Sequence, residues 1–393
     1  MKLSQRVQKL AESATLAVSA KAAAMKKQGI DVVSFGAGEP DFPTPEHIRA
    51  AAKAALDAGH TGYAKPASGI LEAKQAVCAK LKRENQLDYE PSQVLITVGG
   101  KEALYLACMA VLDPDDEVIL PAPYWVSYPE QIQLCEARSV VVEGLENNGY
   151  KVTADQIAEA ITDRTRVLIF NSPSNPGGFT YSPDEVKAIA DVVADRNILV
   201  FSDEMYDRLI YRDQRFLSFA AASPRAFAQA LTFNAGSKTY SMTGWRVGYV
   251  AGPESVIKAM AKIQSQTTSG TATFNQYGLV EALNGDQDPA EQMRREFEAR
   301  AEYMHERLNA LAGVRCVRPT GAFYAFPNVS GAYAKLGVSN SIDFSAKVLE
   351  EAHVALVPGI AFGMDAHVRL SFAASMAQIK KGLDRMEELL GKA

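Results

Sequence analysis

Two basic side chains in one short stretch have the types needed for covalent and anion chemistry. Lys238 lies between small polar residues, and Arg246 follows eight residues later. Lysine is the side chain that forms Schiff bases with carbonyl compounds. The planar guanidinium of arginine binds two phosphate oxygens at once. The stretch therefore indicates covalent chemistry beside an anion site, and the alternative is a solvated lysine with a surface arginine.

Three further stretches carry polar groups that suit a ligand. Gly99 and Gly100 precede a helical pattern, where backbone N–H groups and the helix N-terminus favour an anion. Asn175 lies in a loop with two prolines and two glycines, and its side chain both donates and accepts hydrogen bonds. Asp203 ends an apolar run, where a buried carboxylate needs a cation or a metal. Each feature alone has an ordinary alternative: a strand-to-helix turn for the glycines, a loop held by its own hydrogen bonds for Asn175, and a structural salt bridge for Asp203.

All of these residues follow short, β-rich apolar runs that alternate with helical patterns. This alternation predicts an α/β fold with a mainly parallel sheet flanked by helices, whose ligands bind beyond the carboxyl ends of the strands. An anion cradle, a carboxylate, a lysine and an arginine at successive strand ends are the set that pyridoxal 5'-phosphate needs. The expected strands are 94–98, 117–120, 139–142, 167–170, 198–202, 230–234 and 247–251, and the expected helices are 101–112, 128–135, 153–161, 183–195 and 253–265.

The C-terminal part has a different pattern, which predicts a smaller α+β domain. A long charged helix is expected over 289–311, short strands within 321–327, 354–358 and 368–371, and a closing helix over 376–390. The domains are expected to be an N-terminal arm with part of the small domain at 1–45, a large cofactor-binding domain at 46–288 and the small C-terminal domain at 289–393.

Composition excludes several other classes of protein. The chain has 393 residues and a formal net charge of −5, which argues against the basic face of a nucleic-acid-binding protein. No apolar run reaches the roughly 18 residues that span a bilayer. The stretch Met1–Ala20 lacks the apolar core of a signal peptide, which favours a cytoplasmic location. The 4 cysteines and 5 histidines form no CxxC or HxxxH pair, so neither a disulfide framework nor a metal site is predicted.

Several motifs spread along the chain resemble class I aminotransferases of fold type I, which depend on pyridoxal phosphate. The motifs are G-A-G-E-P-D-F at 36–42, Y-A-K-P-A-S-G at 63–69, N-S-P-S-N-P-G-G at 171–178, S-D-E-M-Y at 202–206, S-K-T-Y-S-M-T-G-W-R-V-G-Y at 237–249 and V-P-G-I-A-F-G at 357–363. The resemblance covers essentially the whole chain. It is closest to the bacterial aspartate aminotransferase branch, through S-A-T at 13–15, G-G-K at 99–101 and P-Y-W-V-S-Y at 123–128.

The resemblance implies a role for each matching residue in holding the cofactor. Lys238 would bond to the cofactor aldehyde and then shuttle a proton, and Asp203 would pair with the ring nitrogen. Tyr206 and Asn175 would hydrogen-bond the ring oxygen, and Trp125 would stack on the ring. The phosphate would be surrounded by Gly100, Lys101, Ser237 and Arg246, with Tyr63 reaching in from a second subunit of a homodimer.

The resemblance also implies how a substrate is held. Arg369 would bind the α-carboxylate bidentately, helped by Asn175 and the backbone of Gly38. Lys101 and Thr15 would meet the second carboxylate of a dicarboxylic substrate. We therefore expect transamination between L-aspartate and 2-oxoglutarate, which gives oxaloacetate and L-glutamate.

Two positions depart from the usual family pattern. Gly177 stands where the family usually has threonine, which alters loop stiffness more than chemistry. Relatives that also transaminate prephenate usually place a basic residue near position 11. Ala11 supplies no such charge and Glu12 would repel a carboxylate, so aspartate is favoured over prephenate.

Three alternatives remain at this stage. One is another class I aminotransferase, acting on prephenate, alanine, aromatic amino acids or kynurenine, and the polar pair of Lys101 with Thr15 argues for a dicarboxylate instead. The second is a lyase or decarboxylase of the same fold, against which Arg369 with Asn175 favours transamination. The third is a non-enzymatic regulatory domain, against which the retention of Lys238 argues. Neither nucleic acid nor membrane is an expected partner.

Overall fold

The computed structural model describes residues 2–10, 14–194 and 196–393. Its largest sheet has seven strands in the order β2-β8-β7-β6-β5-β3-β4. β8 is antiparallel to both of its neighbours, and the other strands all run in one direction, so their carboxyl ends meet at one edge. The strands are β2 (Val94–Thr97), β3 (Glu117–Ala122), β4 (Arg138–Glu143), β5 (Thr165–Asn171), β6 (Leu199–Asp203), β7 (Ala230–Ala235) and β8 (Gly248–Ala251).

Side chains along these strands alternate between two faces, as the period of a β-strand requires. In β3, Val118 and Leu120 pack into one apolar cluster, and Ile119 packs into another. In β5, Ile169 belongs to the first of these clusters and Phe170 to the second. All five side chains are at most 3% exposed. The sheet is therefore covered on both faces, which is the normal state of a parallel sheet.

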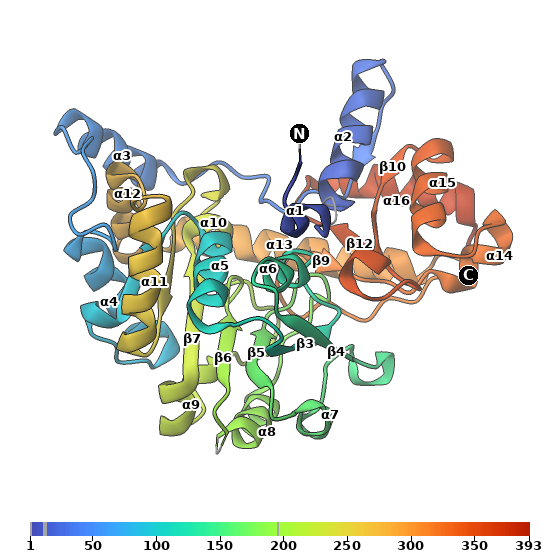
Figure 1. Ribbon diagram of the computed structural model, residues 1–393. Coiled ribbons are helices and arrows are strands. Elements are labelled where there is room, and N and C mark those ends of the chain that lie inside the picture. Colours follow the sequence, from blue (N-terminus) through green and yellow to red (C-terminus); the bar gives the residue numbers. More distant parts are fainter. Residues whose placement is uncertain (1, 11–13, 195) are drawn as a thin grey trace.

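Helices cover both faces of the large sheet (Figure 1). α5, α6 and α11 pack on the face that carries Leu120, whereas α4, α7, α8 and α12 pack on the other. Several of these helices begin at a side-chain cap, such as Ser182, whose hydroxyl accepts a hydrogen bond from the Glu185 N–H. The bounds are α3 (Glu46–Asp57), α4 (Leu71–Asn85), α5 (Gly100–Val111), α6 (Ser127–Leu134), α7 (Ala154–Ala160), α8 (Pro183–Val193), α9 (Pro224–Gln229), α10 (Gly236–Thr239), α11 (Glu254–Thr267) and α12 (Thr273–Asn284).

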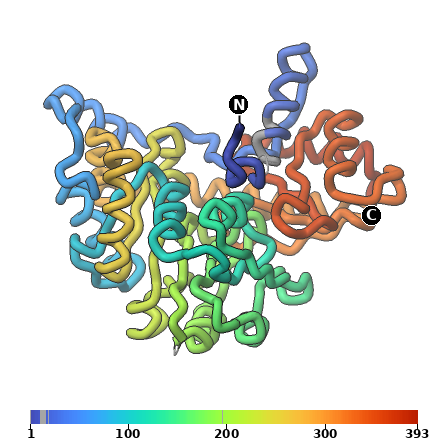
Figure 2. Tube along the Cα trace, in the orientation of Figure 1, coloured from blue at the N-terminus to red at the C-terminus, as the bar shows by residue number. Residues whose placement is uncertain are grey.

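The C-terminal part of the chain forms a smaller α+β unit beside the large sheet, drawn in orange and red in Figures 1 and 2. It holds a three-stranded antiparallel sheet in the order β11-β12-β9, and β10 pairs in parallel with β1 near the N-terminus. The elements are β1 (Val33–Ser34), β9 (Tyr324–Ala325), β10 (Val354–Ala355), β11 (Val357–Pro358), β12 (Val368–Ser371), α13 (Asp288–Asn309), α14 (Tyr333–Leu336), α15 (Ser341–Glu351) and α16 (Met376–Leu390).

The N-terminal segment contributes α1 (Gln5–Gln8) and α2 (Ala14–Lys27). α2 projects upward from the body of the molecule (Figure 1). After β1 the chain runs as an irregular segment from the C-terminal unit across to α3, as the blue tube in Figure 2 shows. This segment passes over the line where the two parts of the molecule meet. No helix in the described ranges is long and apolar enough to cross a membrane.

The predicted α/β fold, with a mainly parallel sheet and a smaller α+β part, is confirmed. Each of the seven strands expected in the middle of the chain is present, with small shifts of its bounds. The closing helix has the expected bounds, Met376–Leu390. The short strand expected within 321–327 is present as β9, which covers Tyr324–Ala325. Ala322 adopts a left-handed backbone with φ 57°, and Pro327 has no N–H for a ladder, which keeps this strand short.

Candidate active site

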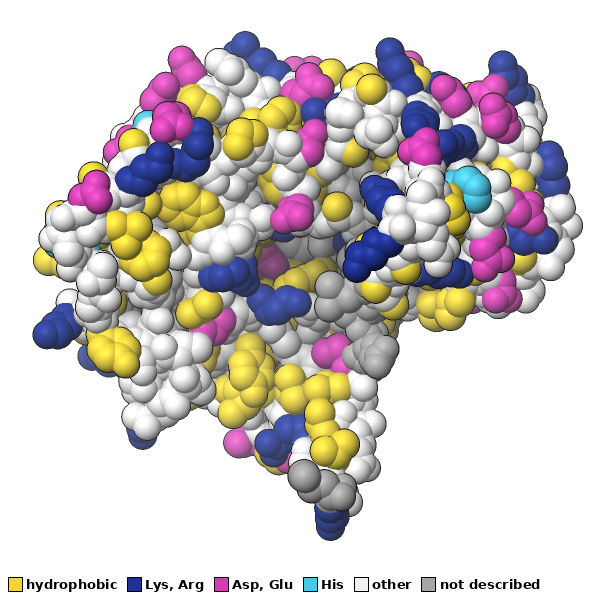
Figure 3. All heavy atoms as spheres, turned by 90° about the horizontal axis from the view of Figure 1, so that it is seen from above, with side chains coloured by type: hydrophobic (Ala, Val, Ile, Leu, Met, Phe, Trp, Pro, Cys, Tyr) yellow, Lys and Arg dark blue, Asp and Glu magenta, His cyan; other side chains and the backbone are white. Residues whose placement is uncertain are grey.

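Polar residues gather at the edge of the sheet where the parallel strands end. β6 ends at Asp203, β7 runs into the short helix that carries Lys238, and the loop after β5 carries Asn175. These three strands are neighbours in the sheet, so their ends lie side by side. Seen from above, the molecule is hollowed near its centre, with Lys and Arg side chains at the edge of the hollow (Figure 3). Sheets of this type bind their ligands at such a place.

The Lys238 amine is partly buried between the large sheet and the C-terminal unit. Its Nζ atom donates a hydrogen bond to the Gly38 carbonyl and lies 5.8 Å from the centre of the Phe323 ring. Burial, followed by the positive charge of Arg369, lowers the pKa of Lys238 from 10.5 to about 8, and the charge of Glu39 opposes the shift. A considerable fraction of the amine is therefore uncharged just above neutral pH, as a nucleophile or proton acceptor must be.

Asp203 is 5% exposed and is held by neutral donors. The Tyr128 hydroxyl donates to its Oδ2 atom at 2.6 Å, and the Met205 N–H donates to Oδ1 at 3.2 Å. Burial raises the pKa of Asp203, and the bond from Tyr128 opposes that rise. In the described ranges, no Lys or Arg lies within ion-pairing distance of this carboxyl, and no group of His, Cys, Asp and Glu could hold a metal. The alternative of a structural salt bridge is therefore wrong, and Asp203 can pair with a cation from outside the chain.

The N-terminus of α5 and the Arg246 guanidinium lie together and form a positively charged region. Gly99 has φ +80°, and a Cβ atom there would come within 2.6 Å of Arg246 Nη2. A Cβ atom on Gly100 would collide with the Met205 methyl group. The N–H groups of the first helical turn have no partner within the helix, so they are free to bind an anion. The hydroxyl of Ser237, which is buried in α10, makes no hydrogen bond to another described residue.

Lys101 adds a second cation at this edge. Its Nζ atom lies 4.9 Å from the centre of the Trp125 ring, which packs edge-on against Tyr128 with ring centres 5.3 Å apart. Partial burial and the charge of Arg246 lower the pKa of Lys101. Two cations near one helix N-terminus favour a multiply charged anion between them.

Arg369 on β12 is a buried guanidinium, 2% exposed. Its Nη1 atom donates to Asn175 Oδ1 at 3.1 Å and its Nη2 atom to the Gly36 carbonyl at 2.9 Å, while the rings of Tyr324 and Phe362 lie 4.6 and 5.0 Å away. Its Nε atom is buried without a partner, and no carboxylate in the described ranges lies within 4 Å of the guanidinium. Burying a charged group without an opposite charge is costly. The arrangement suits a carboxylate ligand that binds two guanidinium nitrogens.

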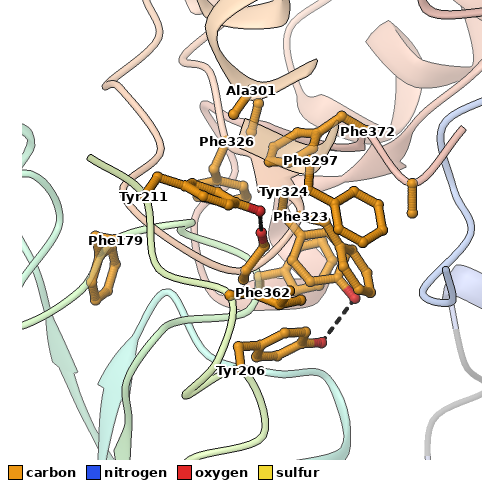
Figure 4. Packing of buried hydrophobic residues seen from close by; sticks show 14 of the residues in the cluster. Phe179, Tyr206, Tyr211, Phe297, Ala301, Phe323, Tyr324, Phe326, Phe362 and Phe372 are labelled. Carbon is orange, nitrogen blue, oxygen red and sulfur yellow. Dashed lines mark hydrogen bonds between the residues drawn. The ribbon is translucent and has the colours of Figure 1, made fainter. Parts of the chain in front are cut away.

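Tyr206 and Tyr324 connect the two parts of the site, since their hydroxyls lie 3.0 Å apart (Figure 4). A Cβ atom on Gly38 would come 3.4 Å from the Tyr324 hydroxyl. The sequence interpretation gave Tyr324 and Tyr128 no role. Tyr128 lies inside the motif at 123–128, which was a usable signal, whereas Tyr324 lies in an apolar run that gives none.

Two expected site residues are not brought to the site by the described part of the chain. Tyr63 lies on the loop between α3 and α4, and it is 83% exposed. Its reach into a second subunit stays a prediction. The side chain of Thr15 and all of Ala11 and Glu12 lie outside the described residues, so the expectations that depend on them also stay predictions.

The model of the family described as "Aminotransferase class I and II" matches residues 30–386 of the chain. The chain belongs to this family. An aspartate aminotransferase of Geobacillus stearothermophilus is 46% identical over 390 residues, which are 99% of each chain. An aspartate/prephenate aminotransferase of Nitrosomonas europaea is 43% identical, over 99% of this chain and 100% of that one.

Solved structures agree with this family assignment. The aspartate aminotransferase from Rhizobium meliloti superposes with a TM-score of 0.96 at 40% identity, over 100% of both chains. The aspartate aminotransferase from Thermus thermophilus, solved with maleate, superposes with a TM-score of 0.94 at 40% identity, over 99% of this chain and 100% of that chain. The predicted resemblance to bacterial aspartate aminotransferases is thus confirmed for this aminotransferase.

Proposed function

We propose that this aminotransferase transfers the amino group of L-aspartate to 2-oxoglutarate, which gives oxaloacetate and L-glutamate. The observation that carries the proposal is the buried Arg369 guanidinium, which has no acidic partner in the described ranges and an unpaired Nε atom. Arg369 bonds the Gly36 carbonyl and Lys238 bonds the Gly38 carbonyl, so the carboxylate site and the amine lie close together. An α-amino acid needs both groups, one for its carboxylate and one for its α-proton.

Pyridoxal 5'-phosphate is the proposed cofactor, and the observed groups fit it. Lys238 offers an amine for the aldehyde, Asp203 offers a carboxylate without a protein cation for the ring nitrogen, and Gly100 with Arg246 offers a cradle for the phosphate. When bound, this cofactor withdraws electrons from the α-carbon of an amino acid and makes its α-proton acidic. Trp125, Asn175, Tyr206, Lys101 and Ser237 complete the proposed cofactor contacts.

The chain's own groups then orient the substrate and move one proton. Arg369 binds the α-carboxylate through two nitrogens and thereby fixes the direction of the other bonds at the α-carbon. The Lys238 Nζ atom, once released from the Gly38 carbonyl, would take the α-proton of the substrate and hold it for the return transfer. An ionised Asp203 keeps the ring nitrogen protonated, since opposite charges stabilise each other.

The second carboxylate of the substrate is proposed to meet Lys101 and Thr15. The Lys101 amine lies 4.9 Å from the centre of the Trp125 ring and is close enough to Arg246 for their charges to interact. The Thermus thermophilus relative was solved with maleate, which carries two carboxylates. Both observations support a dicarboxylic amino acid as the donor.

Absorbance of the purified holoenzyme tests the proposal directly. Addition of L-aspartate should convert the cofactor band to that of the aminated cofactor, with release of one oxaloacetate for each site. Addition of 2-oxoglutarate should then restore the first band. A protein that stays colourless after incubation with the cofactor, or a band that aspartate leaves unchanged, would refute the proposal. Release of a decarboxylated product instead of oxaloacetate would favour the lyase alternative.

Prephenate is the second candidate acceptor, because several relatives at 42–43% identity are named aspartate/prephenate aminotransferases. The sequence at Ala11 and Glu12 lacks the basic residue expected for prephenate, and we therefore propose that prephenate is a poor substrate. Steady-state rates with oxaloacetate and prephenate as acceptors separate the two. Comparable kcat/KM values would contradict this part of the proposal.

Three further expectations accompany the proposed activity. We propose a homodimer with shared active sites, in which Tyr63 serves the phosphate of the other subunit. We also propose the domain division at 1–45, 46–288 and 289–393. The pairing of β1, in the first range, with β10, in the last range, supports the assignment of part of 1–45 to the small domain. A cytoplasmic location stays a prediction.

A further inference from the structure

The segment Phe35–Thr44, called here the crossing segment, supplies two backbone oxygens to the site. The Gly36 carbonyl accepts from Arg369 Nη2 at 2.9 Å, and the Gly38 carbonyl accepts from Lys238 Nζ. The segment has no strand or helix of its own, so no regular ladder fixes these oxygens. Their positions must therefore depend on contacts made elsewhere along the segment.

Both ends of the crossing segment are anchored, but on different parts of the molecule. At its start, the Phe35 N–H donates to Ala355 at 2.9 Å, and the Phe35 carbonyl accepts from the Ser371 N–H at 2.8 Å. At its end, the Thr44 hydroxyl donates to the Ser241 carbonyl at 2.6 Å. The first anchor lies on the C-terminal unit and the second on the large sheet's side, as the course of the chain in Figure 2 shows.

Between these anchors, one buried ion pair ties the middle of the segment to α13. Arg300 is 4% exposed, and its Nη1 atom donates to Asp41 Oδ1 at 2.6 Å. The guanidinium also lies 5.0 Å from the Phe42 ring and 5.5 Å from the Phe297 ring, which meet edge-on with centres 5.5 Å apart. Phe297 in turn packs against Phe323, the ring beneath the Lys238 amine (Figure 4).

Arg300 already has an acidic partner on its own helix, so the bond to Asp41 is an additional contact. Its Nε atom already donates to Glu296, one turn earlier on α13, at 3.0 Å. The bond to Asp41 joins positions 259 residues apart in the sequence. The side chain of Asp41 is 26% exposed, so water can solvate it if the guanidinium is removed. Loss of the pair is therefore expected to loosen the middle of the crossing segment and to leave the rest of α13 in place.

We infer that Arg300 is a positioning residue for the proposed transamination, which acts through Asp41 to hold the Gly36 and Gly38 carbonyls against Arg369 and Lys238. Arg300 touches neither substrate nor cofactor in this assignment. It fixes the acceptor that orients the Arg369 guanidinium, and with it the carboxylate site. The inference rests on the proposed function for its meaning, but its first test requires no turnover.

The test compares Arg300→Met with Arg307→Met in the holoenzyme. Arg307 is a matched control, because it lies on the same helix, bonds Tyr303, Asp384 and Glu387, and has no contact with the crossing segment. Hydrogen exchange of the Phe35 and Ser371 backbone amides, which form the hydrogen bonds at the start of the crossing segment, is measured by mass spectrometry. We expect exchange about tenfold faster in Arg300→Met and unchanged in Arg307→Met, since a hydrogen bond to a charged group is lost only in the first.

Maleate binding and steady-state kinetics give the second readout. For Arg300→Met, the Kd for maleate and the KM for aspartate should rise about tenfold, while kcat changes less. Lys238 must leave the Gly38 carbonyl before it takes the proton, whereas Arg369 is oriented by the Gly36 carbonyl as it binds the carboxylate. Arg300→Lys should recover part of the loss. Asp41→Asn should reproduce the effect and serves as the second variant if Arg300→Met does not fold.

The outcomes separate the inference from the proposed function. Equal exchange of the Phe35 and Ser371 amides in Arg300→Met, Asp41→Asn and wild type would overturn the inference even if the enzyme transaminates aspartate. Equal loss of maleate affinity in Arg300→Met and Arg307→Met would also overturn it, because the effect would then be general destabilisation. A wild-type protein that leaves aspartate unchanged refutes the proposed function, whereas the exchange experiment still reports on the crossing segment.

Discussion

The hydroxyl of Tyr128 lies 2.6 Å from Oδ2 of Asp203, and both groups are buried at the carboxyl end of the sheet. This bond joins the start of α6 to the end of β6, and it favours the ionised form of a carboxyl whose pKa burial raises. In the proposed enzyme, that charge faces the ring nitrogen of the cofactor. The strength with which the cofactor is held should therefore depend on a tyrosine that does not itself touch it.

Tyr128→Phe should weaken cofactor binding by about tenfold, because one hydrogen bond to a charged acceptor is removed. The Kd for pyridoxal phosphate is measured by absorbance titration of the cofactor-free protein. Tyr105→Phe is the control. Tyr105 packs against the same apolar cluster as Tyr128, but its hydroxyl makes no hydrogen bond to Asp203. Equal affinities in the two variants would show that the bond does not serve the cofactor.

Arg369→Lys should raise the KM for aspartate by about 10- to 100-fold, because an ammonium cannot bind a carboxylate through two fixed nitrogens. The Kd for the cofactor should change much less than this KM, since Arg369 is proposed to bind the substrate and reaches the cofactor site only through Asn175. Steady-state kinetics and the cofactor titration are both needed. A loss of cofactor affinity as large as the rise in KM would argue against a substrate role.

The Lys238 amine should set a pH dependence for cofactor attachment. Its pKa is lowered from 10.5 to about 8, so the nucleophilic, uncharged amine increases as pH rises through about 8. The rate of covalent attachment to the cofactor-free protein should rise over the same interval. Arg369→Gln should move the midpoint upward, because the Arg369 charge lowers this pKa. Stopped-flow absorbance from about pH 6 to about pH 10 measures both the rise in rate and the shift of its midpoint, because this range spans the lowered lysine pKa and approaches the ordinary one. A midpoint that the substitution leaves in place would contradict the coupling.

His367 should make the fold sensitive to acid. Its ring stacks on Phe326, its Nε2 atom lies 3.1 Å from the Tyr150 hydroxyl, and burial lowers its pKa from 6.5 to about 4. The folded chain thus holds a neutral imidazole that the unfolded chain protonates below pH 6.5. The contribution of His367 to the free energy of unfolding is fully present above pH 6.5. It is lost as pH falls toward 4, and the loss reaches about 3 kcal/mol.

Urea unfolding of His367→Gln at pH 7 and pH 4.5 measures that effect. The variant should lose less stability between the two pH values than wild type does. His60→Gln, which changes an exposed ring beside Tyr277, should lose as much stability between the two pH values as wild type does. If His367→Gln lost as much stability as wild type, groups other than His367 would cause the acid sensitivity.

Mixed subunits should show whether Tyr63 serves a second chain. Lys238→Ala and Tyr63→Phe are each expected to reduce activity in separate preparations. After unfolding and refolding together, a hybrid dimer contains one site with Lys238 from one chain and Tyr63 from the other, so activity should exceed the sum of the separate preparations. Exposure of Tyr63 to 83% in the single chain is the observation behind this prediction. No gain on mixing would show that Tyr63 does not serve the active site of a second subunit.

The sequence alone determined which residues end the parallel strands. Lys238, Asp203 and Asn175 each follow an apolar run, and the alternation of such runs with helices implies a sheet whose strand ends meet. The chemistry of the amine, the carboxylate and the glycine-rich turn at Gly100 could be read before any coordinates. Local pattern suffices here because each of these residues is positioned by the strand that immediately precedes it.

The tertiary structure alone decided the contacts between distant residues of the site, where Arg369 was expected only from the resemblance to the family. Arg369 reaches Asn175 and Gly36, and Tyr324 reaches Tyr206, from segments far apart in the sequence. These contacts depend on how the C-terminal unit packs against the large sheet, and they come from strands as short as two residues, which have too few positions to show a period. The absence of a protein cation beside Asp203, in the part of the chain that the structure describes, has the same origin. Ion pairing between buried groups is settled by packing in three dimensions, which a one-dimensional pattern does not contain.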